Sequence, residues 1–183
     1  DITLDAATAH PRLEILDDGK SVKDAGRLQT VPYHKNRFNS LVLVLAKEGF
    51  TSGRHYWEVD VGKLSSFSLG VAQESVIREG IVKICPENGF WVIKFGLWES
   101  WAYTVPWTPL NFNEKLRKIG VFLDIPAKKL SFFDVKKKKA FFTFNLGGNQ
   151  EVKFIPLFSP NPTGHERTVE PIRIVEGFDD EEE

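Results

Sequence analysis

Histidine and cysteine, the residues that most often bind zinc or act as nucleophiles, are few and dispersed in this sequence. The four histidines stand at positions 10, 34, 55 and 165, and Cys85 is the one cysteine. Zinc sites need ligands at close, characteristic spacings, and a reactive cysteine needs surroundings that lower its pKa. The sequence shows neither pattern. We therefore interpret His55 as a packed or hydrogen-bonded residue rather than a metal ligand, and Cys85 as an unreactive thiol rather than a nucleophile.

Two carboxylates share one face of an expected strand. Apolar and polar residues alternate over residues 55–61, which puts Glu58 and Asp60 on the same side. Such a pair could act as a general acid and base, but no nearby residue suggests a positioned substrate. The sequence also lacks a nucleophile elbow, a phosphate-binding glycine loop and a His-Glu-x-x-His helix. We therefore expect solvated carboxylates and a domain that is not an enzyme and uses no cofactor or metal.

The largest basic cluster is the run Lys136, Lys137, Lys138 and Lys139. It separates two apolar segments, 130–133 and 141–144, so we expect it at the tip of a β-hairpin. One interpretation is a charged tip that keeps sheet edges from pairing with other chains. The other is a weak contact with phosphate groups or an anionic membrane. Without the acidic residues 179–183 the chain has 24 basic and 20 acidic residues, too small an excess to indicate nucleic-acid binding.

Short segments with period-two alternation follow one another along the chain, separated by turn residues. They cover residues 55–61, 67–71, 89–95, 118–124, 129–134, 140–144, 152–158 and 171–175. No long amphipathic helix intervenes, so the pattern predicts an antiparallel sandwich or barrel. A short N-terminal helix is the one exception, with Asp5 as its cap before Ala6 and Ala7. The segments 18–39 and 159–170 show no strand pattern and are expected to be loops, where binding residues concentrate.

Length and composition indicate one intracellular domain. The 183 residues suffice for a single core without disulfides or metals. No methionine is present, so we expect a piece of a longer chain. One cysteine, no usable Asn-x-Ser/Thr acceptor, no signal peptide and no apolar run of about 18 residues together indicate a cytoplasmic location. The acidic tail (residues 179–183) is expected to be disordered, because a block of like charges cannot be buried.

Blocks that resemble one family occur in order along the whole chain. The first part resembles a PRY segment in Leu4-Asp5-Ala6, Asp17-Asp18-Gly19-Lys20 and Arg37-Phe38. The remainder resembles an SPRY domain in residues 49–59, 69–72, 86–91, 120–124, 130–135 and 156–160. This resemblance to the PRY-SPRY family implies an all-β fold, a bent sandwich of two antiparallel sheets of the concanavalin-like jelly-roll type. It implies one domain over residues 1–178, with PRY about 1–50 and SPRY about 51–178.

The resemblance also implies a non-catalytic module that recognises a protein target. Such modules stand at the C-terminus of tripartite-motif ubiquitin ligases, whose RING domain lies elsewhere in the chain, and in the cytosolic tails of butyrophilins. Both settings imply a role in innate immunity and a location in the cytoplasm or on the cytosolic face of a membrane. The isolated domain is expected to be a monomer, whereas the parent protein could dimerise. The alternative is a butyrophilin-like sensor of a small phosphorylated ligand, which requires several convergent basic residues.

In the family, variable loops at one end of the sandwich form the binding surface. By position they correspond to residues 25–37, 68, 77–85, 94–103, 146–151 and 159–167. Two tryptophans near an expected loop tip, Trp98 and Trp101, could anchor a partner because tryptophan buries much area at little entropic cost. Trp57 and Trp91 lie in core-like blocks and are expected to be structural. The predicted partner-binding residues are Tyr33, Lys35, Ser68, Lys83, Lys94, Trp98, Trp101, Tyr103, Asn161 and His165.

Overall fold

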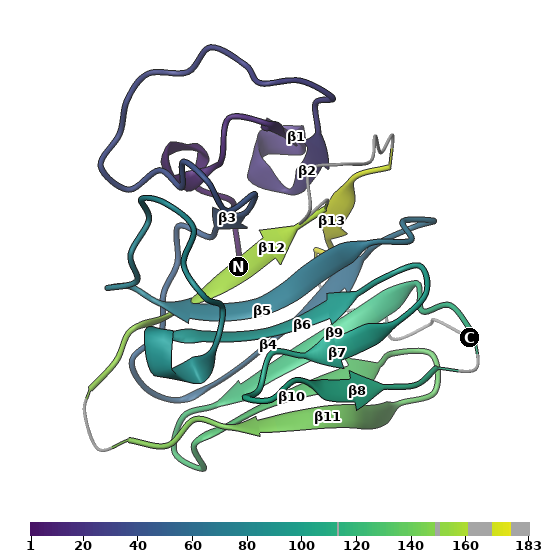
Figure 1. Cartoon of the computed structure of the whole chain (residues 1–183). Helices are drawn as coiled ribbons and strands as arrows, with labels where there is room; N and C mark the ends of the chain where they lie inside the picture. Colours follow the sequence, from purple (N-terminus) through teal and green to yellow (C-terminus); the bar gives the residue numbers. More distant parts are fainter. Residues whose placement is uncertain (113, 149–150, 161–169, 177–183) are drawn as a thin grey trace.

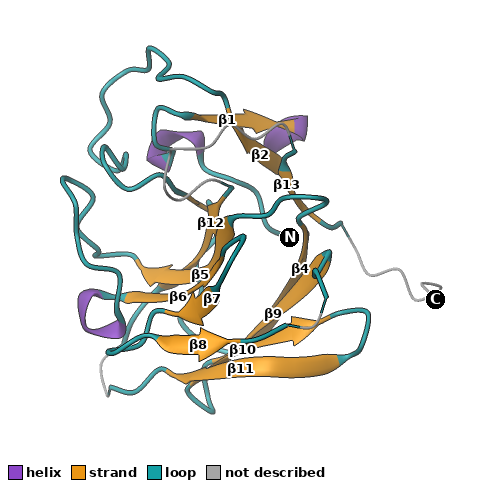
Figure 2. Ribbon diagram, turned by 45° about the vertical axis from the view of Figure 1, so that its right-hand side comes forward, coloured by secondary structure: helices purple, strands orange, loops and turns teal. Residues whose placement is uncertain are grey.

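Two antiparallel sheets form the molecule in the computed structural model, which describes residues 1–112, 114–148, 151–160 and 170–176 (Figures 1 and 2). In spatial order the first sheet contains β1 (Leu13–Leu16), β2 (Ser21–Asp24), β13 (Ile172–Ile174), β4 (Arg54–Asp60), β9 (Lys118–Asp124), β10 (Lys129–Asp134) and β11 (Lys139–Asn145). The second contains β3 (Val44–Leu45), β12 (Phe154–Ser159), β5 (Phe67–Gln73), β6 (Phe90–Phe95), β7 (Ser100–Ala102) and β8 (Thr108–Leu110). The expected all-β sandwich is confirmed.

The hydrophobic core lies between the two sheets and explains the alternation in the sequence. Strand β4 turns Trp57 and Val59 inward, where they are buried, while Tyr56 stays partly exposed. Strand β5 differs because six of its seven residues are buried. Phe38 and Val76, from loops outside the sheets, belong to the same core cluster as β5. Phe38, which precedes β5 in the sequence, and Val76, which follows it, therefore cover the outer side of the second sheet.

Most of the expected elements are present. The eight predicted strand segments correspond to β4, β5, β6 and β9 to β13. The N-terminal helix is a single 3-10 turn, η1 (Ala6–Thr8), and the Asp5 carboxylate accepts a hydrogen bond from the Ala7 amide at 3.0 Å. Lys136, Lys137 and Lys138 lie in the hairpin turn between β10 and β11, as predicted, whereas Lys139 is the first residue of β11. Trp57 and Trp91 are buried, also as predicted.

Two expectations were wrong. Segment 18–39 contains a strand, β2, which pairs with β1 through the 3-10 turn η2 (Asp17–Gly19). Four-residue strands carry too few alternations to stand out in the sequence. Asp60 is not solvated: its side chain is 6% exposed and accepts hydrogen bonds from Arg117 at 3.3 Å and Arg173 at 3.1 Å. These arginines come from other strands or loops, so local sequence could not place them.

Two long loops pack against each other beside the second sheet. The amide of Asn39 donates to the Arg78 carbonyl at 3.2 Å, and the Arg78 guanidinium donates to the Asn36 carbonyl at 2.9 Å. The same guanidinium lies 5.2 Å from the centroid of the Phe38 ring. These contacts fix the 25–43 loop onto the connection between β5 and β6. Among the described residues, no helix is long and apolar enough to cross a membrane.

Candidate functional site

Three of the predicted binding residues form a row across the second sheet. Register places Ser68 of β5 opposite Lys94 of β6, and Lys94 opposite Trp101 of β7. Pro109 of β8 continues the row beyond Trp101. Residues directly opposite each other on antiparallel strands have their side chains on the same face. The sheet therefore brings together residues that are more than 30 positions apart in the sequence.

An aromatic cluster, defined here as Trp101, Tyr103 and Trp107, extends from this row. The rings of Trp101 and Trp107 stack with their centroids 4.3 Å apart and an interplanar angle of 5°. Tyr103 meets both edge-on, at 5.9 Å from Trp101 and 5.6 Å from Trp107. The ammonium of Lys94 lies 4.9 Å from the Trp101 ring, within the range of a cation–π contact. Burial raises the pKa of the Tyr103 phenol, which keeps it neutral.

The turn between β6 and β7 places a further tryptophan beside the cluster. Trp98 is 90% exposed, and its neighbour Leu97 is exposed as well. With Trp101 and Trp107 they line an open cleft of about 670 Å³. The turn depends on Gly96, because a side chain there would collide with the carbonyl oxygen of Glu99. This arrangement can bind an apolar surface, with the ammonium of Lys94 over the Trp101 ring and Lys115 in the lining of the cleft.

Comparison with known proteins identifies the family. Residues 54–172 match the SPRY domain, and residues 2–50 match the SPRY-associated domain PRY. The chain belongs to the PRY-SPRY family. It is 41% identical over 145 residues to human butyrophilin subfamily 1 member A1, an alignment that covers 79% of this chain and 28% of that protein. It is 41% identical over 150 residues to the mouse E3 ubiquitin-protein ligase TRIM58, covering 79% of this chain and 30% of that protein.

Structural comparison supports the same fold. The PSpry domain of TRIM65 superposes with a TM-score of 0.80 at 20% sequence identity, covering 97% of this chain and 90% of that one. Stonustoxin superposes with a TM-score of 0.78 at 23% identity, covering 96% of this chain and 28% of that one. The predicted resemblance is thus confirmed. The PRY-SPRY chain spans less than a third of the length of the two curated relatives named above.

The remaining predicted residues are not all near the aromatic cluster. Lys83 lies in the connection between β5 and β6, whereas Trp98 lies in the turn between β6 and β7. Successive turns of antiparallel strands fall at opposite ends of the sheet, so Lys83 and Trp98 lie beyond opposite ends of β6. The expectation that the predicted binding residues gather at one end of the sandwich was wrong. Tyr33 and Lys35 are exposed in the 25–43 loop, which packs on the Lys83 side through Arg78. Asn161 and His165 lie outside the described residues.

Ser68 occupies its predicted place in the row but is only 3% exposed. Among the described residues, no hydrogen-bond partner meets its Oγ atom. Its role in partner binding stays a prediction. Trp107 and Leu97 were not among the individually predicted binding residues, although Leu97 falls in the expected binding segment 94–103; both are exposed and line the cleft of this PRY-SPRY chain. The sequence signal for Trp107 was its position six residues after Trp101. The two rings stack because the β7–β8 connection brings them together.

The residues first considered for catalysis pack in the fold. His55 stacks on Phe50 with ring centroids 3.8 Å apart, and its Nε2 lies 2.7 Å from the Ser52 carbonyl oxygen. Cys85 is buried and unbridged. Within the described part of the chain, no group of three or more His, Cys, Asp or Glu side chains could hold a metal ion. The geometry of this PRY-SPRY chain is suited to binding by apolar and cation–π contact.

Proposed function

We propose that this PRY-SPRY chain is a non-catalytic recognition module that binds a protein partner through the aromatic cluster and the β6–β7 turn. The observation that carries the proposal is the exposure of Trp98 and Leu97 in a cleft shared with the stacked tryptophans. Contiguous exposed apolar surface marks interaction sites. Tryptophan residues at the centre of such surfaces supply much of the binding energy.

The aromatic cluster is preorganised in the free domain. Stacking of Trp101 on Trp107 and the edge-on contacts of Tyr103 limit the rotamers of all three rings. Less side-chain entropy is then lost on association, which favours affinity. Lys94 is fixed over Trp101 and favours a carboxylate or carbonyl oxygen of the partner at that point.

The relatives suggest the larger protein in which the domain acts. They include a butyrophilin and an E3 ubiquitin-protein ligase. The domain would accordingly select the target of a tripartite-motif ligase, with the RING domain outside this sequence, or form the intracellular domain of a butyrophilin. Either role places it in innate immunity, in the cytoplasm or on the cytosolic face of a membrane, with the isolated domain monomeric.

A sensor of a small phosphorylated ligand fits the geometry less well. A phosphate site needs several convergent cations. In the row across β5, β6 and β7, Lys94 is the one cationic residue, and its ammonium lies over Trp101. Ser68 occupies a second place in the row without a charge. The observations therefore favour a protein partner.

The test is a pull-down from cytosolic lysate with the 183-residue domain, read by mass spectrometry. A Trp98→Ala, Lys94→Glu double variant runs in parallel. Ile81→Ala is the matched control because Ile81 is also an exposed apolar loop residue, 88% exposed, but lies in the β5–β6 connection. The proposal expects a protein retained by the parent domain and by the control and lost by the double variant. Equal retention by all three would refute this site.

A further inference from the structure

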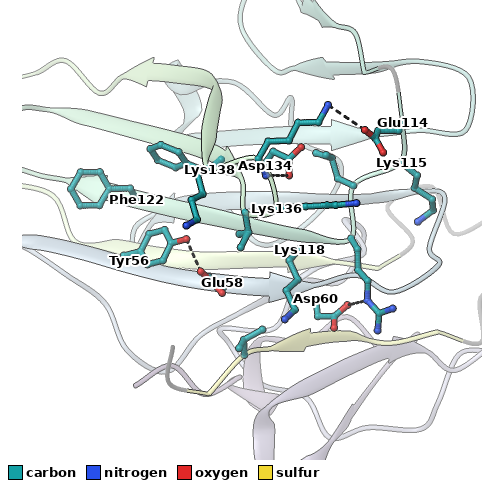
Figure 3. Close-up of a pocket in the computed structure, with 16 residues that line it drawn as sticks. Tyr56, Glu58, Asp60, Glu114, Lys115, Lys118, Phe122, Asp134, Lys136 and Lys138 are labelled. Atoms are coloured by element: carbon teal, nitrogen blue, oxygen red, sulfur yellow. Dashed lines mark hydrogen bonds and ion pairs between the residues drawn. The ribbon is translucent and has the colours of Figure 1, made fainter. Parts of the chain in front are cut away.

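A second, larger cleft opens on the first sheet, on the face directed away from the core. Its volume is about 1130 Å³. Strands β4, β9 and β10 form its floor, and the β10–β11 turn and segment 114–118 form its walls (Figure 3). Lys137 of the turn and Glu114 of the segment join the two walls through an ion pair of 3.2 Å. The second cleft is distinct from the cleft beside the aromatic cluster, although residues 114–116 line both.

Among the described residues, four acidic side chains line the second cleft, and all are already engaged. Asp60 pairs with two arginines, and Asp134 accepts a hydrogen bond from a backbone amide of the β10–β11 turn. Glu58 accepts from the Tyr56 hydroxyl at 2.8 Å, and Glu114 forms the ion pair between the walls. Burial and the contact with Glu58 raise the pKa of the Tyr56 phenol, so it remains a donor. These carboxylates therefore oppose an incoming anion less than free carboxylates would.

The basic side chains of the second cleft outnumber the acidic ones, and their charge is only partly compensated. Six lysine and arginine residues in the described part of the chain line it. Lys136 and Lys138 are exposed, and within the described residues neither side chain forms a hydrogen bond or an ion pair. Lys115 donates to the Gly62 carbonyl at 3.3 Å, a contact that leaves its charge in place. The second cleft is therefore suited to an anion.

The two unpaired ammonium groups do not converge on one point. Figure 3 shows Lys138 extending back over the sheet toward Tyr56, and Lys136 extending toward the wall formed by segment 114–118. A single phosphate group needs cations that converge on it. Carboxylates two residues apart in an extended peptide lie on the same side, about 7 Å apart, so one peptide can reach cations that are separated. The cleft volume of about 1130 Å³ also exceeds the roughly 300–1,000 Å³ of small-molecule pockets.

The floor of the second cleft adds apolar surface beside the lysines. Phe122 and Phe133 are half-buried, and Tyr56 is 37% exposed. A bilayer surface is too broad and flat to enter between the walls and reach this floor. An acidic peptide can place carboxylates on the lysines and an apolar side chain on the aromatic rings. The geometry thus favours a peptide over the anionic membrane that the four-lysine run suggested as an alternative.

We propose that the second cleft binds an extended acidic segment of a partner protein, with carboxylates on Lys136 and Lys138 and an apolar side chain on the aromatic floor. Residues 114–116 line both clefts, so one partner can occupy both. A protein with an apolar patch next to an acidic segment therefore fits the whole surface. Binding at the second cleft does not require binding at the aromatic cluster, and each site has its own test.

Chemical-shift mapping with a defined peptide tests the proposal in the 183-residue protein. The probe is an acetylated and amidated Glu-Glu-Phe-Glu-Glu peptide. The matched control is Gln-Gln-Phe-Gln-Gln, which keeps the length and the phenylalanine but removes the charge. We expect the amides of residues 115–118 and 135–138 to shift and saturate with the acidic peptide and to stay unchanged with the neutral one. In 1 M NaCl the Debye length falls to about 3 Å, so the shifts should disappear.

Charge reversal separates binding in the second cleft from a general attraction to basic surface. Lys136→Glu with Lys138→Glu should weaken peptide binding roughly tenfold, because two favourable charge contacts become repulsive. Lys47→Glu with Lys129→Glu changes the net charge equally at two exposed lysines that do not line the cleft, and should leave the affinity nearly unchanged. Trp98→Ala should also leave the peptide titration unchanged, so a failure at either site is recognised separately.

The proposal fails if neither peptide shifts these amides, or if both peptides shift them alike. Equal loss of affinity in the two charge-reversal variants would show that the peptide does not recognise the cleft. Tighter binding of sodium pyrophosphate than of the acidic peptide at the same amides would identify a phosphate site instead. Sedimentation with vesicles of phosphatidylcholine and phosphatidylserine, without any peptide shift, would identify a membrane contact and likewise overturn the proposal.

Discussion

Replacement of Trp98 by alanine tests the proposed binding surface most directly. A tryptophan side chain contributes on the order of 200 Å², and nine-tenths of Trp98 is exposed in the free domain. Covering about 180 Å² at 25 cal/mol per Å² corresponds to roughly 4.5 kcal/mol. Immobilising the side chain costs about 1 kcal/mol of that. Imperfect burial reduces it further, so we expect Trp98→Ala to weaken partner binding by at least about 2 kcal/mol, or roughly 30-fold.

The same variant should leave the fold intact. Because Trp98 is exposed and lies outside the core cluster, the free energy of unfolding should change by less than about 0.5 kcal/mol. Calorimetric titration with the partner captured by the pull-down measures the affinity, and urea unfolding measures stability. Ile81→Ala controls for the loss of any exposed apolar side chain. An unchanged Kd in Trp98→Ala, with a normal unfolding curve, would show that Trp98 is not part of the interface.

Three further predictions concern stability. Burial lowers the pKa of His10 below its usual value of about 6.5, so the unfolded chain binds the proton more tightly than the folded chain. The free energy of unfolding should therefore fall as the pH drops below about 6.5. His10→Gln should flatten the change of Tm with pH. Gly70→Ala should destabilise the domain by about 3 kcal/mol in urea unfolding, the upper end of the usual cost of overpacking, because the added Cβ would collide with the Trp91 carbonyl. Asp60→Asn should cost about 1–3 kcal/mol in the same assay, because a buried carboxylate that binds two guanidinium groups is lost.

Sequence reasoning predicted the long strands well because their alternation is sustained. Strands β4 and β9 each have seven residues and pair along their whole length, from Arg54 opposite Asp124 to Asp60 opposite Lys118. Strands β7 and β8 have three residues each, and they form by pairing, β7 with β6 and β8 with β7. Such strands form because a neighbouring edge is available, and a local sequence window does not contain that information.

The candidate site likewise has features that the sequence predicted and features that it did not. Family resemblance placed Ser68 and Lys94 in the binding region, and the register confirms that they are cross-strand neighbours. The exposure of Trp98 followed from its position near an expected loop tip. The stack of Trp101 on Trp107 was not predictable, because it depends on the path of the chain between β7 and β8. Nor was the burial of Asp60, which depends on Arg173, 113 residues away.

The aromatic cluster and the exposed Lys136 and Lys138 offer a partner different kinds of contact, and salt can therefore separate their contributions. Contacts to the aromatic cluster rest on the removal of apolar surface from water, which added salt does not screen. Contacts to Lys136 and Lys138 are between exposed charges and weaken as the Debye length shortens. Glu114, Lys115 and Leu116 line both the cleft beside the aromatic cluster and the cleft that Lys136 and Lys138 line, so a large partner on the aromatic cluster would also meet these lysines. The part of its affinity that persists in 1 M NaCl then belongs to the aromatic cluster, and the part that is lost belongs to the lysines.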